Sequence, residues 1–258
     1  FVFSLFLAVL VFIPGIGSDL NTGARSWVKL FSQSFQPAEF LKIAMIIFLA
    51  GYLSDRGREL LDFKKGFLFA LGVGLIPIIL VLLQPDVGTA SVLFVILFGM
   101  LFISGANLWH MFGLAFSGIV GFALMIFIAP YRAARFMTFL NPELDQLGIS
   151  YQVNQAFLAI GSGGIFGLGI GHSLRKYEFL PEVNADSIFA VIAEEVGFIF
   201  TAIFIILLLL ICYRIFKIAK NSPDNFTRLM ISGIVIWFMA QSFTNIGAMV
   251  GLMPLTGL

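Results

Sequence analysis

VGTASVLFVILFGMLFISGANLWHMFGLAFSGIVGFALMIFIAPY, residues 87–131, contains no aspartate, glutamate, lysine or arginine. A helix needs about 20 apolar residues to cross the hydrocarbon core of a bilayer, so these 45 residues are too many for one crossing. The polar stretch 104–107 (SGAN) is the natural place for a turn. We therefore predict two membrane helices here, near 88–104 and 108–130.

Other charge-poor stretches predict further crossings. Residues 66–83, 196–213 and 229–250 have no charged side chain, and 38–53 has only Glu39 and Lys42. Residues 1–14 are the remnant of one more span. The prediction is an all-α, polytopic membrane helix bundle with seven transmembrane helices. Because both ends lie in apolar runs, we expect the chain to be truncated at both ends.

The composition supports a membrane protein and argues against other classes. Hydrophobic residues make up 60% of the chain, charged residues make up 11%, and the mean hydropathy is +1.03. Soluble domains are usually about 45–50% apolar and about 25% charged. A net charge of +1 argues against a nucleic-acid partner. The single cysteine, Cys212, cannot form an internal disulfide.

Basic residues indicate the orientation. Four lie in 55–65 and four in 213–228, and positive charge marks cytoplasmic loops. Four more lie in 131–185, against the simple rule, although long loops weigh less in orientation. Seven alternating crossings place both loops on that side and leave 15–36, 84–87 and 131–185 outside. We predict that 131–185 is a large extracytoplasmic loop within a single transmembrane domain spanning 1–258. A connection of this length is usually functional.

The long outer segment holds much of the polar chemistry. Residues 151–160 (YQVNQAFLAI) predict a short helix at the membrane interface, with Gln152 and Gln155 on one face. A glycine-dense stretch, 161–171, follows. It matches neither nucleotide-binding glycine motif, so we expect it to allow a loop and a helix to pack closely, or to bend over a substrate.

Five motifs in order carry a family resemblance. They are 23–27 (GARSW), 36–42 (QPAEFLK), 84–90 (QPDVGTA), 151–152 (YQ) with its glycine run, and 180–198 (LPEVNADSIFAVIAEEVGF). The chain resembles the SEDS family (shape, elongation, division and sporulation) over nearly its whole length. The resemblance implies a ten-helix fold, of which these would be the third to ninth helices. It also implies a multi-pass protein of the bacterial cytoplasmic (inner) membrane. Residues 131–135 and 173–176 look closer to the division-type member.

The resemblance implies an activity. The family polymerises peptidoglycan glycan strands from lipid II, a disaccharide-peptide on undecaprenyl pyrophosphate. Asp186 matches the family's essential loop aspartate and is expected to be the general base that takes a proton from the acceptor sugar. The alternative is that Asp186 only caps the helix that follows. Both roles can coexist.

The other candidates would bind substrate. Glu39 and Lys42 lie three residues apart within a membrane span, where they can pair; a purely structural ion pair is the alternative. Trp27 could stack on sugar, or serve as an interfacial tryptophan. A last set, expected to grip the substrate and its pyrophosphate, comprises Arg132, Arg135, Gln152, Arg175 and Lys176. Contact with anionic lipid headgroups is the alternative for the cations.

Cofactors and partners are less constrained by the residues. His110 and His172 lack companions at metal-ligand spacing, so no protein-built metal site is expected, although a divalent cation (Mg or Mn) could screen the pyrophosphate. Asp86, Glu194 and Glu195 are expected to be mainly capping or hydrogen-bonding residues. By resemblance, the partners are a class B penicillin-binding protein transpeptidase and other divisome or elongasome proteins. A lipid II flippase and a non-catalytic division scaffold are the alternative functions.

Overall fold

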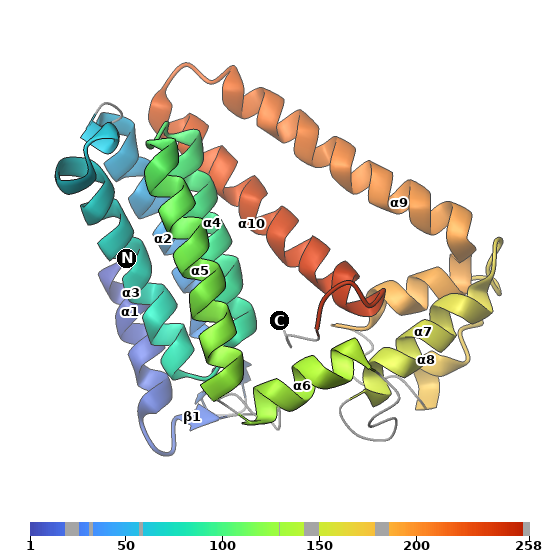
Figure 1. The fold of residues 1–258 in the computed structure, drawn as a ribbon. Coiled ribbons are helices and arrows are strands. Elements are labelled where there is room, and N and C mark those ends of the chain that lie inside the picture. Colours follow the sequence, from blue (N-terminus) through green and yellow to red (C-terminus); the bar gives the residue numbers. More distant parts are fainter. Residues whose placement is uncertain are drawn as a thin grey trace. The chain divides into compact units, whose positions relative to one another are not determined.

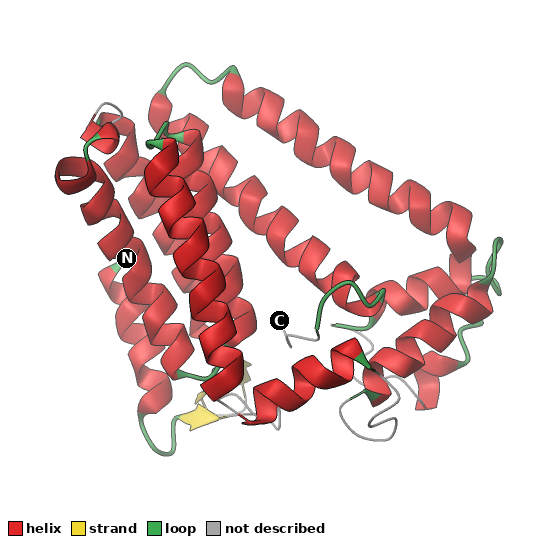
Figure 2. Cartoon of the chain, in the orientation of Figure 1, coloured by secondary structure: helices red, strands yellow, loops and turns green. Residues whose placement is uncertain are grey.

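Helices form nearly all of the regular structure (Figures 1 and 2). A computed structural model describes residues 1–18, 26–30, 33–56, 59–128, 130–141, 150–178 and 186–254. The α-helices are α1 (Val2–Val9), α2 (Pro37–Asp55), α3 (Leu68–Leu83), α4 (Val87–Ile103), α5 (Leu108–Ile128), α6 (Pro130–Leu140), α7 (Tyr151–Gly163), α8 (Arg175–Glu178), α9 (Ile188–Lys220) and α10 (Asn225–Met249). Three shorter helical turns are η1 (Leu10–Phe12), η2 (Glu59–Leu61) and η3 (Phe63–Phe67). The predicted all-α class is confirmed.

The predicted crossings coincide with apolar helices. Five helices in the described part of the chain are long and apolar enough to cross a membrane: Pro37–Asp55, Phe63–Leu83, Leu108–Ile128, Ile188–Lys220 and Asn225–Met249. The other two predicted crossings correspond to shorter apolar helices, Val2–Phe12 and Val87–Ile103. The protein is therefore a multi-pass membrane protein, as composition required.

The chain forms two compact units. The first contains Phe1–Ile119 and Arg214–Ala240, and the second contains Val120–Tyr213 and Gln241–Leu258. In the first unit, helices α1 to α4 lie side by side (Figure 1). The buried stripe of α2 repeats every fourth residue (Leu41, Met45, Leu49), because residues four apart share one helix face.

Small residues set the close packing of these helices. A Cβ atom added to Gly74 of α3 would lie 2.3 Å from Leu97 Cδ1 of α4. One added to Gly233 of α10 would lie 2.7 Å from Ile46 Cγ2 of α2 and 3.0 Å from the Met100 sulfur of α4. These glycines therefore let the apolar side chains of neighbouring helices fit against backbone, as small residues do in membrane bundles.

The predicted turn between α4 and α5 is confirmed. Gly105 has φ +87°, which favours glycine at a helix C-terminus. The Ala106 N–H donates to the Leu101 carbonyl and the Gly105 N–H to the Phe102 carbonyl, both at 3.1 Å. This bonding pattern is that of a Schellman motif. It ends α4 and allows the chain to reverse into α5.

A small antiparallel sheet lies in the outer segment 15–36, where the sequence predicted no strand. Its strands are β1 (Gly17–Ser18), β2 (Trp27–Leu30) and β3 (Gln33–Phe35), in the order β1-β2-β3. Ser18 lies opposite Trp27, and Val28 lies opposite Phe35. Runs of two to four residues are too short to show the alternating pattern that predicts a strand from sequence.

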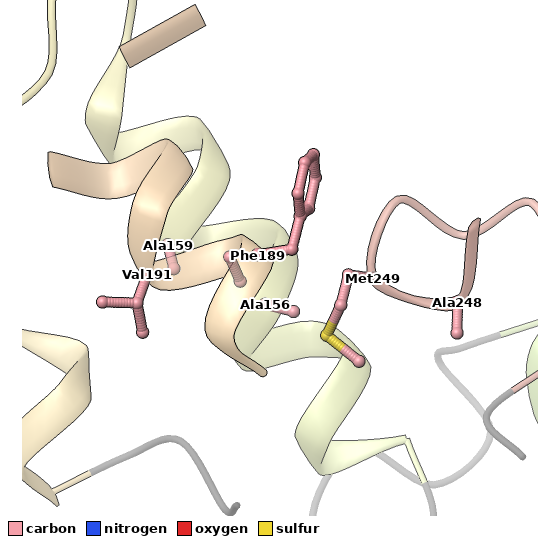
Figure 3. Packing of buried hydrophobic residues seen from close by; sticks show 7 residues of the cluster. Ala156, Ala159, Phe189, Val191, Ala248 and Met249 are labelled. Carbon is pink, nitrogen blue, oxygen red and sulfur yellow. The ribbon is translucent and has the colours of Figure 1, made fainter. Parts of the chain in front are cut away.

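The second unit contains helices from the predicted extracytoplasmic loop. The predicted helix 151–160 is present as α7, extended to Gly163. It packs on the first turns of α9 and on the end of α10 (Figure 3). The buried cluster comprises Ala156, Ala159, Phe189, Ala190, Val191, Ala248 and Met249. Two alanines on α7 keep its surface flat, so α9 can approach closely.

Candidate functional site

Asp186 lies two residues before Ile188, the first residue of α9, and is half-buried. The Ser187 carbonyl accepts the N–H groups of Ala190 (3.1 Å) and Val191 (3.3 Å). The backbone therefore places Ser187 at the cap position of α9, with Asp186 one residue before it. Gln152 of α7 donates from Nε2 to the Ser187 hydroxyl at 3.2 Å. The carboxylate of Asp186 is thus carried by a helix start that α7 holds by packing and by a hydrogen bond.

Helix α9 is interrupted at Gly197, which has φ 79° and ψ 178°. Residues 164–169 of the glycine run form hydrogen bonds with the backbone of α9 on both sides of this interruption. The Phe198 N–H donates to the Gly164 carbonyl (2.9 Å) and the Ile199 N–H to the Ile165 carbonyl (3.3 Å). In the opposite direction, the Glu194 and Glu195 carbonyls accept N–H groups from this loop. The donors are Leu168 (3.0 Å) and Gly169 (2.9 Å).

These reciprocal hydrogen bonds satisfy backbone N–H and carbonyl groups that would otherwise lack a partner. In a continuous helix, residues 198 and 199 would donate to residues 194 and 195. The break at Gly197 frees two donors and two acceptors, and the glycine loop supplies a partner for each. Unsatisfied backbone groups are costly at membrane depth. The expectation that the glycine run lets a loop pack closely on a helix agrees with this geometry.

Glu194 and Glu195 have the hydrogen-bonding roles expected of them. Glu194 is 1% exposed. It accepts the Ser173 hydroxyl at 2.5 Å and the Ser162 hydroxyl at 3.2 Å. Glu195 forms an ion pair with Lys176, with 2.7 Å between Oε1 and Nζ. The two carboxylates therefore bind the segment that precedes α8 and the first residues of that helix.

The remaining basic candidates have local partners. Arg175 donates from Nη1 to the Gln155 side-chain oxygen on α7. Arg132 of α6 donates from Nη1 to the Met125 carbonyl at 3.4 Å. Arg135 also belongs to α6, but its side chain lies outside the described residues. Their role at pyrophosphate stays a prediction.

The first unit holds a separate polar group on α2. Lys42 is fully buried, and its Nζ lies 2.8 Å from Glu39 Oε1 and 5.0 Å from the centre of the Trp237 ring of α10. An ammonium at that distance is attracted by the face of an indole ring. The prediction that Glu39 and Lys42 pair is confirmed. Sequence reasoning missed Trp237, because nothing local in α10 sets it apart from other membrane tryptophans.

Asp86 caps α4, as expected. Its carboxylate accepts the Thr89 N–H at 3.0 Å, the Thr89 hydroxyl at 2.8 Å and the Gln36 side-chain amide at 3.1 Å. Burial in the turn between α3 and α4 raises the pKa of Asp86, and these hydrogen bonds together with the charge of Lys42 oppose the rise. The carboxylate therefore links the start of α2 to the start of α4.

The other predicted elements of the site are only partly visible. Trp27 lies on β2 and is half-buried. Most of motif 23–27 and the residues 180–185 before Asp186 lie outside the described residues. Among the residues that the structure describes, no group of three or more His, Cys, Asp or Glu could hold a metal ion.

The ion pair on α2 gives a stability prediction. Glu39→Gln is expected to destabilise the protein more than Lys42→Met. The first change leaves a fully buried ammonium short of its anion, whereas the second leaves a carboxylate that is 41% exposed. Removing one partner of a buried pair costs about 3–5 kcal/mol, and the exposure of Glu39 favours the lower value. Thermal unfolding of the full-length protein in detergent measures both variants.

The matched control is the double variant Glu39→Gln/Lys42→Met. It should unfold close to Lys42→Met, because no buried charge then lacks its partner. Equal losses of stability in the two single variants would contradict this account of the pair.

Comparison with known proteins shows the family to which the chain belongs. A family model described as cell cycle protein, which groups FtsW, RodA and SpoVE, matches residues 1–258. Stage V sporulation protein E of Bacillus subtilis is 40% identical over 257 residues, which cover 100% of this chain and 70% of that protein. The probable peptidoglycan glycosyltransferase FtsW of Pasteurella multocida is 43% identical over 267 residues, covering 100% and 66%.

Two solved structures are similar. A chain of a peptidoglycan synthase complex, studied for its coordination of polymerization and crosslinking, has a TM-score of 0.79 at 30% identity. The match covers 99% of this chain and 70% of that chain. The rod shape determining protein RodA of Thermus thermophilus has a TM-score of 0.66 at 28% identity, covering 99% and 66%. The chain thus spans about two thirds of the length of these relatives.

Proposed function

The chain belongs to the FtsW, RodA and SpoVE family of cell cycle proteins, and from this premise we propose that it is a peptidoglycan glycosyltransferase polymerising lipid II. The relatives named as probable peptidoglycan glycosyltransferases are 36–43% identical and align with nearly the whole chain. It is a multi-pass protein of the bacterial cytoplasmic membrane. Bacterial cell division is the process that we favour.

One observation carries the proposal. The family motif continues through Asp186, and this half-buried carboxylate stands at the start of a helix that is fixed against α7. A general base must be held within hydrogen-bond reach of the proton that it removes. A rigid helix start offers a more constant position than an unsupported loop, so Asp186 is our candidate for the catalytic residue.

The proposed step is a substitution at the anomeric carbon of the donor sugar. Asp186 takes the proton of the acceptor hydroxyl, and the acceptor oxygen forms the new glycosidic bond, with inversion. The bond from the anomeric carbon to undecaprenyl pyrophosphate breaks, and the electron pair leaves with the pyrophosphate. Arg132, Arg135 and Arg175 are proposed to stabilise the charge of this leaving group.

Other groups are proposed to bind the substrate. Gln152 lies one hydrogen bond from Ser187 beside the proposed base, and its amide suits contact with sugar hydroxyls. Glu39, Lys42 and Trp27 belong to the first unit and are proposed to bind lipid II there. Among the described residues, no group of three or more His, Cys, Asp or Glu could hold a metal ion. A Mg or Mn ion carried by the pyrophosphate itself remains an expectation.

A partner protein is part of the proposal. The solved relative with a TM-score of 0.79 is one chain of a peptidoglycan synthase complex that was studied for its structural coordination of polymerization and crosslinking. We propose that this chain works with a class B penicillin-binding protein transpeptidase, and with other divisome or elongasome proteins. Coupled enzymes of this kind would make and crosslink a strand at one place.

A lipid II transporter is the second candidate. The buried Lys42, paired with Glu39 inside a membrane span, favours it, because intramembrane ionisable residues mark substrate and ion pathways. The substrate site of a transporter would, however, be expected near the bilayer midplane. The polar network of Glu194, Glu195 and Lys176 belongs to the same unit as Asp186, and it supports a site there rather than at the Glu39–Lys42 pair.

Reconstitution separates these candidates. Full-length protein is combined with its transpeptidase partner, whose own active-site serine has been replaced, and fluorescent lipid II is added in detergent and in liposomes. Glycan strands resolved on a gel in detergent support the polymerase, since no membrane has to be crossed. Movement of lipid II between leaflets without any polymer would overturn the proposal in favour of a transporter. Neither activity, in the presence of a stable complex, would indicate a scaffold.

A further inference from the structure

Residues 173–176 are fixed to α9, the helix that starts beside the proposed base. Glu194 of α9 accepts the Ser173 hydroxyl at 2.5 Å, and Glu195 accepts the Lys176 ammonium at 2.7 Å and the Ser173 N–H at 3.5 Å. The Lys176 N–H donates in turn to the Ser173 hydroxyl at 3.2 Å. We call Ser173, Lys176, Glu194 and Glu195 the clamp.

The clamp joins residues that lie on both sides of the proposed base in the chain. Lys176 precedes Asp186 by ten positions, and Glu195 follows it by nine. On the other side of Asp186, Ser187 is tied to Gln152 of α7 at 3.2 Å. Described residues on both sides of Asp186 in the chain are therefore held to α9 or α7.

The hydrogen bonds and the ion pair of the clamp are buried or partly buried. Glu194 and Ser173 are each 1% exposed, and the side chains of Lys176 and Glu195 are 20% and 14% exposed. Partly buried ion pairs are screened less by salt than exposed pairs are. The backbone carbonyls of Glu194 and Glu195 are also engaged, by the N–H groups of Leu168 and Gly169. The backbone of the two glutamates is thus held in place by bonds other than those that their side chains make to residues 173–176.

The same geometry bears on the role of Lys176. To contact a pyrophosphate, its ammonium would have to leave a carboxylate at 2.7 Å, and Glu195 would then keep a partly buried charge without that cation. We propose that the clamp positions Asp186, with Lys176, Glu194 and Glu195 as positioning residues that hold residues 173–176 on α9, the helix whose start carries the proposed base. This inference rests on the proposed function, because it assigns the clamp to the same catalytic carboxylate.

A charge swap tests the clamp in the full-length protein with its partner. Lys176→Glu and Glu195→Lys are each expected to lower kcat roughly tenfold or more, with little change of KM for lipid II. The double variant Lys176→Glu/Glu195→Lys should recover most of kcat, since it restores the ion pair with reversed charges. Lys217→Glu, an exposed lysine near the other end of α9, is the matched control and should behave as wild type.

A second measurement does not depend on catalysis. Hydrogen–deuterium exchange of peptides covering 173–190 should speed up in both single variants and return toward wild type in the double variant. Faster exchange in neither single variant would overturn the clamp. A double variant with restored exchange protection but the low kcat of Lys176→Glu would also overturn it, and would assign Lys176 to substrate.

These readouts separate failure of the inference from failure of the proposed function. If Asp186→Asn keeps full polymerase activity, the proposed base is wrong. The exchange data still report whether the clamp orders this segment. If Asp186→Asn is inactive while the clamp variants exchange and turn over like wild type, the base stands and the clamp does not.

Discussion

Asp186→Asn is expected to abolish measurable glycan polymerisation while leaving expression, folding and lipid II binding close to wild type. An amide has nearly the shape of a carboxylate, but it cannot accept the proton of the acceptor hydroxyl. General base catalysis contributes about 10²- to 10⁴-fold to rate. A loss near the upper end of this range would leave too little product to detect on a gel. Because Asp186 is only half-buried, its replacement should cost little stability.

The measurement is strand formation from purified lipid II by the full-length protein with its partner. The matched control is Asp224→Asn, the same chemical change at an exposed carboxylate that accepts the Thr227 N–H at the start of α10. Asparagine and aspartate cap helices about equally well, so this variant should retain full activity. Equal product from wild type and Asp186→Asn would rule out the assignment of the base.

Gly197→Ala is expected to give the largest loss of stability of any single change proposed here. At Gly197 the backbone has φ +79°, and an added Cβ would lie 2.2 Å from the Gly167 backbone nitrogen and 2.5 Å from the Phe166 carbonyl carbon. These neighbours are backbone atoms that cannot rotate away. A clash of this kind adds to the strain of a backbone conformation, φ 79° and ψ 178°, that essentially only glycine adopts. We expect a cost on the order of 4 kcal/mol or more.

The expected result is loss of monodisperse full-length protein in detergent, or a large fall in its thermal unfolding temperature. Gly161→Ala is the control, because a Cβ at this position of α7 meets nothing within 4 Å. Alanine should there be neutral or slightly stabilising, by up to about 1 kcal/mol. If Gly197→Ala unfolded like wild type, α9 would have to run through residue 197 as a continuous helix.

The same change has a consequence for function. The loop at 164–169 and the backbone of α9 at 194–199 satisfy each other's hydrogen bonds. The side chains of the clamp start from this same stretch of α9. A shift at Gly197 would therefore disturb the carboxylates of Glu194 and Glu195 together with the backbone. Any folded fraction of Gly197→Ala should accordingly show low polymerase activity.

Local features of the sequence determined the class of the protein. Hydropathy and charge depend only on the residues in one stretch, so they located the apolar helices and the turn at 104–107. The pairing of Glu39 with Lys42 was also predictable, because three residues along a helix bring side chains to one face. Motif order placed Asp186 before a helix. Each of these inferences needs no knowledge of what lies across the fold.

Tertiary structure decided what those residues touch. The sequence did not predict the break of α9 at Gly197, because a lone glycine in an apolar run is also common in an unbroken membrane helix. It did not predict that Trp237 lies over Lys42, nor the small sheet that contains Trp27. Lys176 looked like a phosphate ligand from its charge alone, and its pairing with Glu195 became visible only when α9 was placed beside it. Such contacts join residues far apart in the chain, and their geometry is set by packing that no local pattern contains.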